Sequence, residues 1–483
     1  MVILALLMCV ASGYLLISTA WVNDRARISD LVLKLSLSLG FGTGIFSAVF
    51  FLVRLLRATG LIAIDASVLV LFLVLHLFRR RAAAEVREQN YSHEDIHAPG
   101  WLHAILAASL AVTVLAALYR AVIRIIAHPH GDGWDAFAIW NLHARFLFLG
   151  GDHWRDGFSQ RIPWSHPDYP LLLPSAIAHF WSYLGQDHPL VPAIISLVFA
   201  FSTLALLTST LLQLRGPIAA MLGGLALSST PFFIEQGTSQ YADVPLSFFI
   251  LAALVLLHLD GRRSLDASGY RSGLLILAGL AAGFAAWTKN EGLLFLFALG
   301  AAQVWVFTLK PIRDQSGGRS SPRRLFLFVL GALPMLAILG WFKHSVATPI
   351  DLFSSPAMIH KILSPSRYWI ITQWYVKELL RFGSWWIVPG TVAMLVFYLL
   401  IHKKRGPGRE PLLSASQIAL GLTLAGYVAI YVITPRDLYW HLRFSLNRLF
   451  LQAWPSVVFL FFLVAGRQFS QTESNSAPKR AIC

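Results

Sequence analysis

The sequence predicts an all-α membrane protein, a polytopic bundle of about thirteen transmembrane helices with amphipathic interfacial helices in long extracytoplasmic loops. Composition is the first reason: the 483 residues are 56% hydrophobic and 13% charged, which is about half the charged fraction of a soluble domain. The 16 Trp and 33 Phe argue against a disordered chain. The two cysteines, Cys9 and Cys483, exclude a disulfide framework and a cysteine-based zinc module.

A transmembrane helix is expected wherever roughly 20 mainly apolar residues follow one another. The first such stretch lacks a basic start and another follows it directly, so we interpret it as a retained helix and not as a signal peptide. In chain order the predicted spans are 2–22, 31–53, 60–78, 101–126, 189–213, 217–235, 241–259, 272–288, 291–309, 325–345, 385–402, 415–433 and 448–466.

The net charge of +15 would suit a nucleic-acid-binding protein. The cations, however, lie in short loops between apolar stretches, as the positive-inside rule predicts, and we expect no nucleic-acid partner. Taking 79–87 as cytoplasmic places the tail from Gln468 on that side and the segments 127–188, 346–384 and 434–447 outside. It also makes these cations cytoplasmic: Arg262, Arg263, Lys310, Arg313, Arg319, Arg323, Arg324, Lys403, Lys404, Arg405 and Arg467.

The long outer segments contain amphipathic stretches, WDAFAIWNLHARFLFLG and YWIITQWYVKELLRF. Helices of this kind lie in the membrane interface with their aromatic side chains toward lipid. The stretch 368–385, with Lys377, Glu378 and Arg381, either shapes a groove for an acceptor molecule or is an aromatic anchor at head-group level.

Acidic residues follow the fourth span. Asp132 and Asp135 are spaced as in a capping box, with Asp in place of Glu. The same spacing would hold a carboxylate rigidly at the water boundary, so capping and a chemical role are compatible.

Several motifs occur in a fixed order along the chain. The first group is Asp135, Ala144-Arg145, Gly151-Asp152-His153-Trp154 and His166-Pro167-Asp168-Tyr169-Pro170-Leu171; QYADVPLSFF around Asp243, AAWTKNEGLLF around Lys289 and NRLFLQAWP around Arg448 follow. With these motifs in this order, the sequence resembles the GT-C superfamily of integral-membrane glycosyltransferases. Within that superfamily it is most similar to the RgtA/B/C/D-like and protein-mannosyltransferase-like group. The resemblance covers about 101–466. It implies a GT-C-like catalytic membrane domain there, preceded by an extension with three spans and a basic loop (1–100) and followed by a disordered cytoplasmic tail (467–483).

The resemblance implies transfer of a sugar from a polyprenyl-phosphate donor to an acceptor hydroxyl, at the extracytoplasmic face of the inner (plasma) membrane. Asp135 would be the general base, and inversion of the anomeric carbon would follow from a single displacement. Ala136 stands where the family often has Glu, which leaves open whether Asp132 replaces that acid. Arg448, Lys289 and Arg145 would contact the donor phosphate, with His166 and Asp243 also lining the substrate site.

Simpler roles stay open for most of these residues. Lys289 could only pair with Glu291, Arg145 could be a snorkelling cation, and Asp243 could be a helix cap. His166 could be an ordinary loop histidine. No cofactor is expected to be required; a divalent metal held by His128, His130, Asp132 and His153 is the alternative.

The expected partners are a polyprenyl-phosphate-linked sugar, membrane lipids and an envelope acceptor, either lipid, polysaccharide or protein. Three other functions compete with transfer. These are a lipid-linked saccharide flippase or transporter, a noncatalytic scaffold for envelope assembly, and an O-antigen-type ligase or polymerase. The gathering of charges at span ends and in outer loops disfavours the transporter, which would need charges at mid-span.

Overall fold

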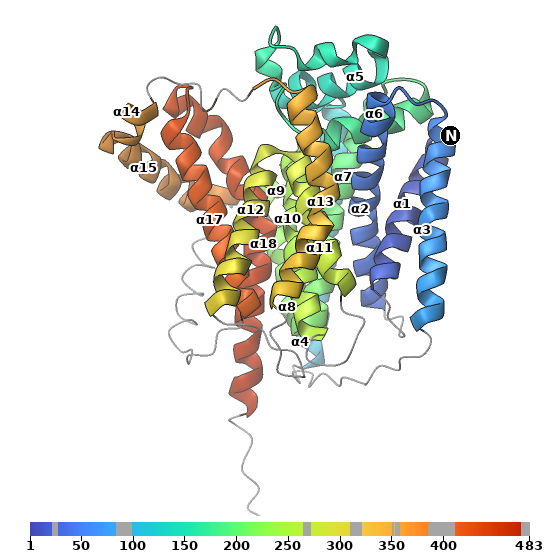
Figure 1. Cartoon of the computed structure of the whole chain (residues 1–483). Coiled ribbons are helices and arrows are strands. Elements are labelled where there is room, and N and C mark those ends of the chain that lie inside the picture. The colour runs from blue at the N-terminus through green and yellow to red at the C-terminus, as the bar shows by residue number, and fades with distance from the viewer. Residues whose placement is uncertain are drawn as a thin grey trace, which may run out of the picture.

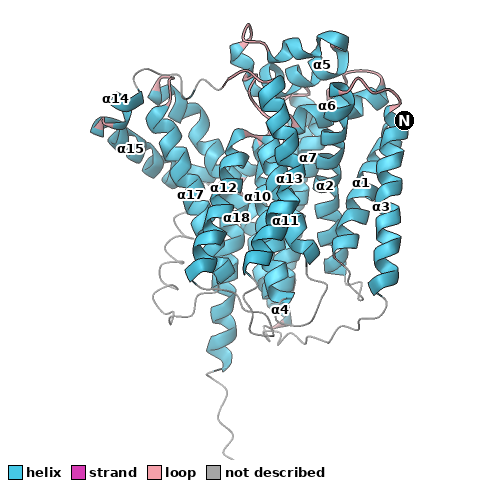
Figure 2. Ribbon diagram, viewed as in Figure 1, coloured by secondary structure: helices cyan, strands magenta, loops and turns pink. Residues whose placement is uncertain are grey.

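The computed structural model describes residues 1–21, 28–83, 99–263, 272–309, 321–349, 352, 358–384 and 411–474. Over these residues every regular element is a helix (Figure 2), which confirms the all-α prediction. Ten of the helices are long and apolar enough to cross a membrane. They stand side by side as one bundle (Figure 1), as expected for a multi-pass membrane protein.

The first three helices are α1 (Val2–Ala20), α2 (Ile28–Leu55) and α3 (Leu61–Ala83). Glycines allow α1 and α2 to touch along their backbones, because a Cβ on Gly42 would lie 2.2 Å from the carbonyl oxygen of Cys9. Small residues at such crossings are typical of membrane helices. The division of the chain at residue 100 stays a prediction.

Polar contacts join these helices to the rest of the bundle. The Ser47 hydroxyl on α2 donates to the carbonyl of Leu172 at 2.7 Å and accepts from the indole of Trp287 at 3.2 Å. On α3 the buried carboxylate of Asp65 is bound by His179 at 2.7 Å and Tyr183 at 2.6 Å. The N-terminal helices therefore hold both ends of α6 (Leu172–Leu184) and the end of α11 (Ser272–Thr288).

The middle of the bundle is formed around α10 (Asp243–Arg263), of whose most apolar window 94% is buried inside the protein. By contrast, only 6% of the corresponding window of α4 (Gly100–Ala127) is buried, so its apolar side chains are left for lipid. The other long helices are α7 (Leu190–Arg215), α12 (Asn290–Leu309), α13 (Ser321–Ser345), α17 (Pro411–Ile433) and α18 (Leu438–Ser474).

The predicted count of thirteen spans is not confirmed. The predicted span 217–235 is not one continuous helix: it is divided into α8 (Pro217–Ser228) and α9 (Pro231–Gln236), neither of which is long enough to cross by itself. Proline lacks an amide donor, and Pro231 starts the second helix after the break. The stretch 272–288 forms α11, which is apolar but short, and 385–402 lies outside the described residues.

The last helix differs from the prediction at both ends. It begins at Leu438, so most of the segment 434–447, which we expected to be an outer loop, is the first part of α18. Neither Pro nor Gly interrupts residues 438–447, and the helix continues through them. It also runs to Ser474, into the predicted tail; residues 475–483 lie outside the described residues.

Short helices cover the end of the bundle at which the N-terminus lies, called here the upper end (Figure 1). As expected, the basic residues Arg79 and Arg80 near the end of α3 and Arg323 and Arg324 at the start of α13 lie at the opposite end. The upper helices are η1 (Ala136–Trp140, a π-helix), α5 (Asn141–Leu149), η2 (Gly151–Phe158), η3 (Pro163–Ser165), α14 (Met358–Ile362), α15 (Pro365–Arg381) and η5 (Phe382–Ser384).

Candidate active site

Four of the predicted site residues meet at the upper end of the bundle, although they are far apart in sequence. Arg448 Nη1 forms an ion pair with Asp135 Oδ2 and lies 3.8 Å from Asp243 Oδ2. Lys289 Nζ donates to Asp243 Oδ1 at 2.9 Å. Each residue comes from a different element, so the fold assembles the cluster from four separate stretches.

Local structure explains each position. Asp243 is the first residue of α10, where a carboxylate is favoured by the helix dipole. Lys289 lies in the break between α11 and α12. Arg448 is well inside α18 rather than at its start, where we expected it. Asp135 directly precedes the π-helix η1 and has no capping hydrogen bond from its side chain.

The exposed fraction of the side chains increases from the Asp243–Lys289 pair to the Arg448–Asp135 pair. The side chains of Asp243 and Lys289 are 1% and 5% exposed, whereas those of Arg448 and Asp135 are 19% and 23% exposed. A ligand would therefore reach Arg448 and Asp135 first. Glu291, 3.2 Å from Lys289 Nζ, adds a third acid, so Lys289 has both the pairing with Glu291 and a place in the cluster.

Residues on α17 and α18 position the Asp243 carboxylate from its buried side. Gln452 Nε2 donates to Asp243 Oδ1 at 2.6 Å, and the Tyr427 hydroxyl donates to Gln452 Oε1 at 2.8 Å. The sequence reasoning missed both. The signal for Gln452 was its place four residues after Arg448, which puts the two side chains on the same face of a helix.

A second polar group adjoins the cluster. Lys343, in the last turn of α13, donates to Asn290 Oδ1 at 2.8 Å and to the carbonyl oxygen of Asp168. Asn290 Nδ2 donates to Asp168 Oδ2 at 2.7 Å. Lys343 was not among the predicted residues, because a cation at the end of an apolar span is usually a simple boundary charge.

Aromatic rings line the rim. The Arg448 guanidinium lies 5.2 Å from the ring centre of Tyr241, and Lys289 Nζ lies 5.8 Å from that of Tyr169. His166 stacks on Tyr169 at 4.6 Å. Burial, assisted by Arg436, lowers the pKa of His166 below its ordinary value, so His166 is placed at the rim as a neutral imidazole.

Two predicted residues lie apart from the cluster. The Asp132 carboxylate forms an ion pair with Arg124, and its role as a helix cap stays a prediction. Arg145 Nε donates to Asp187 Oδ2 at 2.9 Å, and its guanidinium lies 6.0 Å from the Trp181 ring centre. The partner of Asp132 thus lies on α4 and that of Arg145 in the outer segment.

The alternative metal site is not assembled. Among the residues that the structure describes, no three His, Cys, Asp or Glu side chains form a group that could hold a metal ion. His153 instead lies 3.7 Å from Asp156.

The family-model comparison agrees with the resemblance noted in the sequence. Residues 182–348, which include Asp243 and Lys289, match the family model of dolichyl-phosphate-mannose-protein mannosyltransferase. The structure is similar to the crystal structure of ArnT from Cupriavidus metallidurans bound to undecaprenyl phosphate, with 18% sequence identity and a TM-score of 0.47. That alignment covers 77% of this chain and only 61% of ArnT. No curated protein sequence matches the chain.

Proposed function

We propose that the chain is a membrane glycosyltransferase that moves a sugar from a polyprenyl-phosphate carrier to an acceptor hydroxyl. We place the reaction at the upper end of the bundle and assign that end to the extracytoplasmic face of the inner membrane. One observation carries the proposal: Asp135, Asp243, Lys289 and Arg448 form a single cluster of acids and cations at that end. The family match over residues 182–348 supports it independently.

In the proposed reaction the bond between the anomeric carbon and the carrier phosphate oxygen breaks as the acceptor oxygen bonds to that carbon. The hydroxyl proton passes to the Asp135 carboxylate, and the carrier phosphate leaves as an anion. General-base assistance of this kind gives ~10²–10⁴ in rate. Arg448 and Lys289 would stabilise the charge that builds on the departing phosphate, commonly the largest contribution to catalysis.

Arg448 is suited to hold base and phosphate together. Its Nη1 is bound to Asp135, while its Nε is buried without a hydrogen-bond partner among the described residues. A guanidinium presents donors on more than one edge. Once the side chains that cover it move aside, the edge that carries Nε can receive a phosphate oxygen while Nη1 keeps the Asp135 carboxylate in place.

Transfer assays of the purified protein in nanodiscs, with a panel of polyprenyl-phosphate sugars, test the proposal. Asp135→Asn should abolish transfer while expression and insertion persist. Asp152→Asn is the matched control, since Asp152 is an exposed outer acid 3.6 Å from Arg57. Asp132→Asn shows whether the neighbouring acid shares the role.

Normal transfer by Asp135→Asn would refute the base assignment. Movement of a lipid-linked saccharide across the bilayer without transfer would indicate a transporter instead. Retained complementation after loss of both Asp135 and Arg448 would indicate a scaffold.

A further inference from the structure

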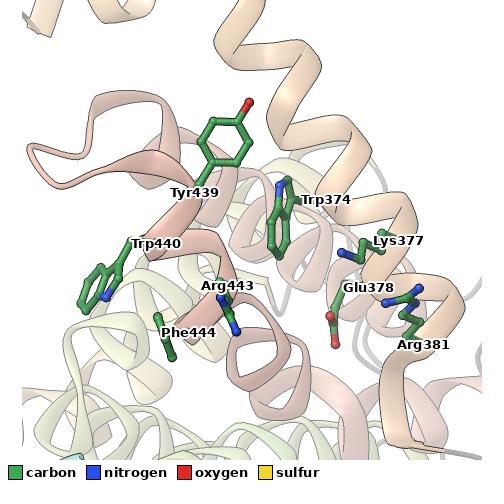
Figure 3. A pocket seen from close by; sticks show the side chains of 8 residues that line it. All are labelled: Trp374, Lys377, Glu378, Arg381, Tyr439, Trp440, Arg443 and Phe444. Carbon is green, nitrogen blue, oxygen red and sulfur yellow. The ribbon is translucent and has the colours of Figure 1, made fainter.

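A groove of about 670 Å³ lies between the end of α15 and the start of α18, apart from the cluster just described. Figure 3 shows the side chains from the two helices that line this space. Its lining combines charged groups with aromatic rings. The residues are Trp374, Lys377, Glu378 and Arg381 from α15 and Tyr439, Trp440, Arg443 and Phe444 from α18.

The groove has an excess of positive charge. Three of its residues are cations, and Glu378 is its one acid. Within the part of the chain that the structure describes, Lys377, Arg381 and Arg443 form no salt bridge. Burial raises the pKa of Glu378, and its basic neighbours Lys377 and Arg381 act in the opposite direction.

The aromatic rings support the cations. Lys377 Nζ lies 4.6 Å from the ring centre of Trp374, and the Arg443 guanidinium lies 5.5 Å from that of Phe444. Cations held against aromatic faces keep their outer donors free for an anion. The groove can therefore receive a negatively charged group and pack an apolar part of the same ligand.

Its position points to a ligand from the membrane. α18 is one of the ten helices long and apolar enough to cross a membrane, the groove lies on its first turns, and α15 is not among the ten. The side chains of Trp369, Tyr439 and Trp440 are 65%, 55% and 49% exposed. Trp and Tyr at the end of a span are typical of the lipid head-group level.

The groove also adjoins the candidate active site. Trp440, Phe444 and Arg448 follow one another at four-residue intervals along α18, so their side chains lie on one face of the helix. The apolar wall of the groove therefore leads along α18 toward Arg448.

We propose that this groove binds the phosphate-bearing head group of an anionic membrane lipid, at a site separate from the phosphate that we place at Arg448. Lys377, Arg381 and Arg443 would contact the phosphate, the aromatic rings would pack on the glycerol region, and the acyl chains would stay in the bilayer. This binding does not depend on the transferase activity, so the two proposals can fail separately.

Lipid binding to the full chain tests the proposal directly. The protein is reconstituted in phosphatidylcholine bilayers with or without phosphatidate, and the lipids it retains are counted by native mass spectrometry. Each of Arg443→Gln and Arg381→Gln should weaken phosphatidate retention about fivefold, since one cation near a membrane surface contributes about 1 kcal/mol. Added salt should weaken it further.

Two variants separate this effect from damage to the fold. Arg155→Gln is the matched control, because Arg155 also rests on an aromatic ring, 5.4 Å from the centre of Trp154, but outside the groove. It should retain phosphatidate as the wild type does. Glu378→Gln removes the acid of the groove and should tighten retention, an outcome that disruption could not produce.

Unchanged retention in both arginine variants, or no gain in Glu378→Gln, would overturn the proposal. Equal displacement of phosphatidate by soluble glycerol phosphate would also overturn it, because the ligand would then be a free phosphate rather than a lipid. Asp135→Asn should keep the lipid while losing transfer, so a failure of the proposed function is recognised separately.

Discussion

Gln452 donates a hydrogen bond to Asp243 Oδ1 at 2.6 Å, and the same oxygen accepts from Lys289 at 2.9 Å. Asp243 is thus fixed by one charged and one neutral donor. Since Arg448 lies 3.8 Å from the other oxygen of Asp243, the orientation of this carboxylate also determines where the guanidinium can lie.

Gln452→Leu should lower the rate of transfer per folded molecule about tenfold. It should also lower the unfolding midpoint, because it leaves the buried Tyr427 hydroxyl without its acceptor. The lost bond contributes about 1–3 kcal/mol to the position of Asp243, while Lys289 still neutralises the carboxylate. Turnover and thermal unfolding in detergent would be measured together. Gln303→Leu is the control: Gln303 is buried, with both amide atoms unpartnered among the described residues, and its loss should be neutral or stabilising. Equal rates in the two variants would contradict the prediction.

Gly133→Ala should displace the turn that carries Asp135. Gly133 has φ +103°, and a Cβ there would lie 2.6 Å from the Tyr241 hydroxyl, so both strain and a clash result. Such strain costs about 1–3 kcal/mol, so we expect the rate of transfer to fall by a factor between about five and about a hundred and fifty. Adding Tyr241→Phe should recover part of the loss, because it removes the clash but not the strain. Gly340→Ala, in open space on α13, should be silent.

Ser47→Ala should destabilise the protein by about 1–3 kcal/mol, because it leaves the buried indole N–H of Trp287 without its acceptor. The thermal unfolding midpoint in detergent would be compared with that of Ser67→Ala. Ser67 is an exposed serine bonded to Ala63 of its own helix at 2.8 Å. Indistinguishable midpoints would mean that Ser47 does not hold α2 to α11.

The stability of the protein should fall as the pH falls from about 7 to about 5. Burial lowers the pKa of His143 from 6.5 to about 3 and also lowers that of His166. Below about 6.5 the unfolded chain therefore binds protons that the folded one does not, at a cost of up to ~1.4 kcal/mol per pH unit for each histidine. His143→Phe should make the fall in the unfolding midpoint less steep. An unchanged slope would show that His143 can be protonated in the folded protein.

Transfer should not require a divalent metal, because Arg448 and Lys289 already place two positive charges beside the proposed leaving phosphate. Transfer rates in EDTA and in the calcium–EDTA complex should be equal. A loss in EDTA alone that magnesium or manganese restores would show that a metal takes part.

The positions of Asp135, Asp243, Lys289 and Arg448 could be anticipated because each lies at or near the end of an apolar stretch. Spans cross the membrane from one side to the other, so alternate span ends must gather at the same face. The sequence therefore indicated which charges share an end of the bundle. Their order along the chain, compared with a family, indicated which of them share a site.

The partners of other residues could not be anticipated in this way. Arg145 and Asp187 are far apart in sequence, and their pairing depends on how the outer segment folds back on itself. Lys343 has the pattern of a boundary cation, yet α13 places it against Asp168. The start of α18 was missed for a different reason: residues 438–447 are too polar for a hydropathy window, yet neither Pro nor Gly interrupts them and the helix continues through them.

The π-helix η1 (Ala136–Trp140) lies between Asp135 and α5 and has one more residue per hydrogen-bonded turn than an α-helix. Removing one residue there would let the α-helix continue and turn Asp135 by about 100° around the axis, away from Arg448. The loss of a single codon would thus change the direction of this carboxylate without moving α5, which follows the π-helix. Insertions and deletions in this turn are a route by which related chains could gain or lose the acid–guanidinium pair.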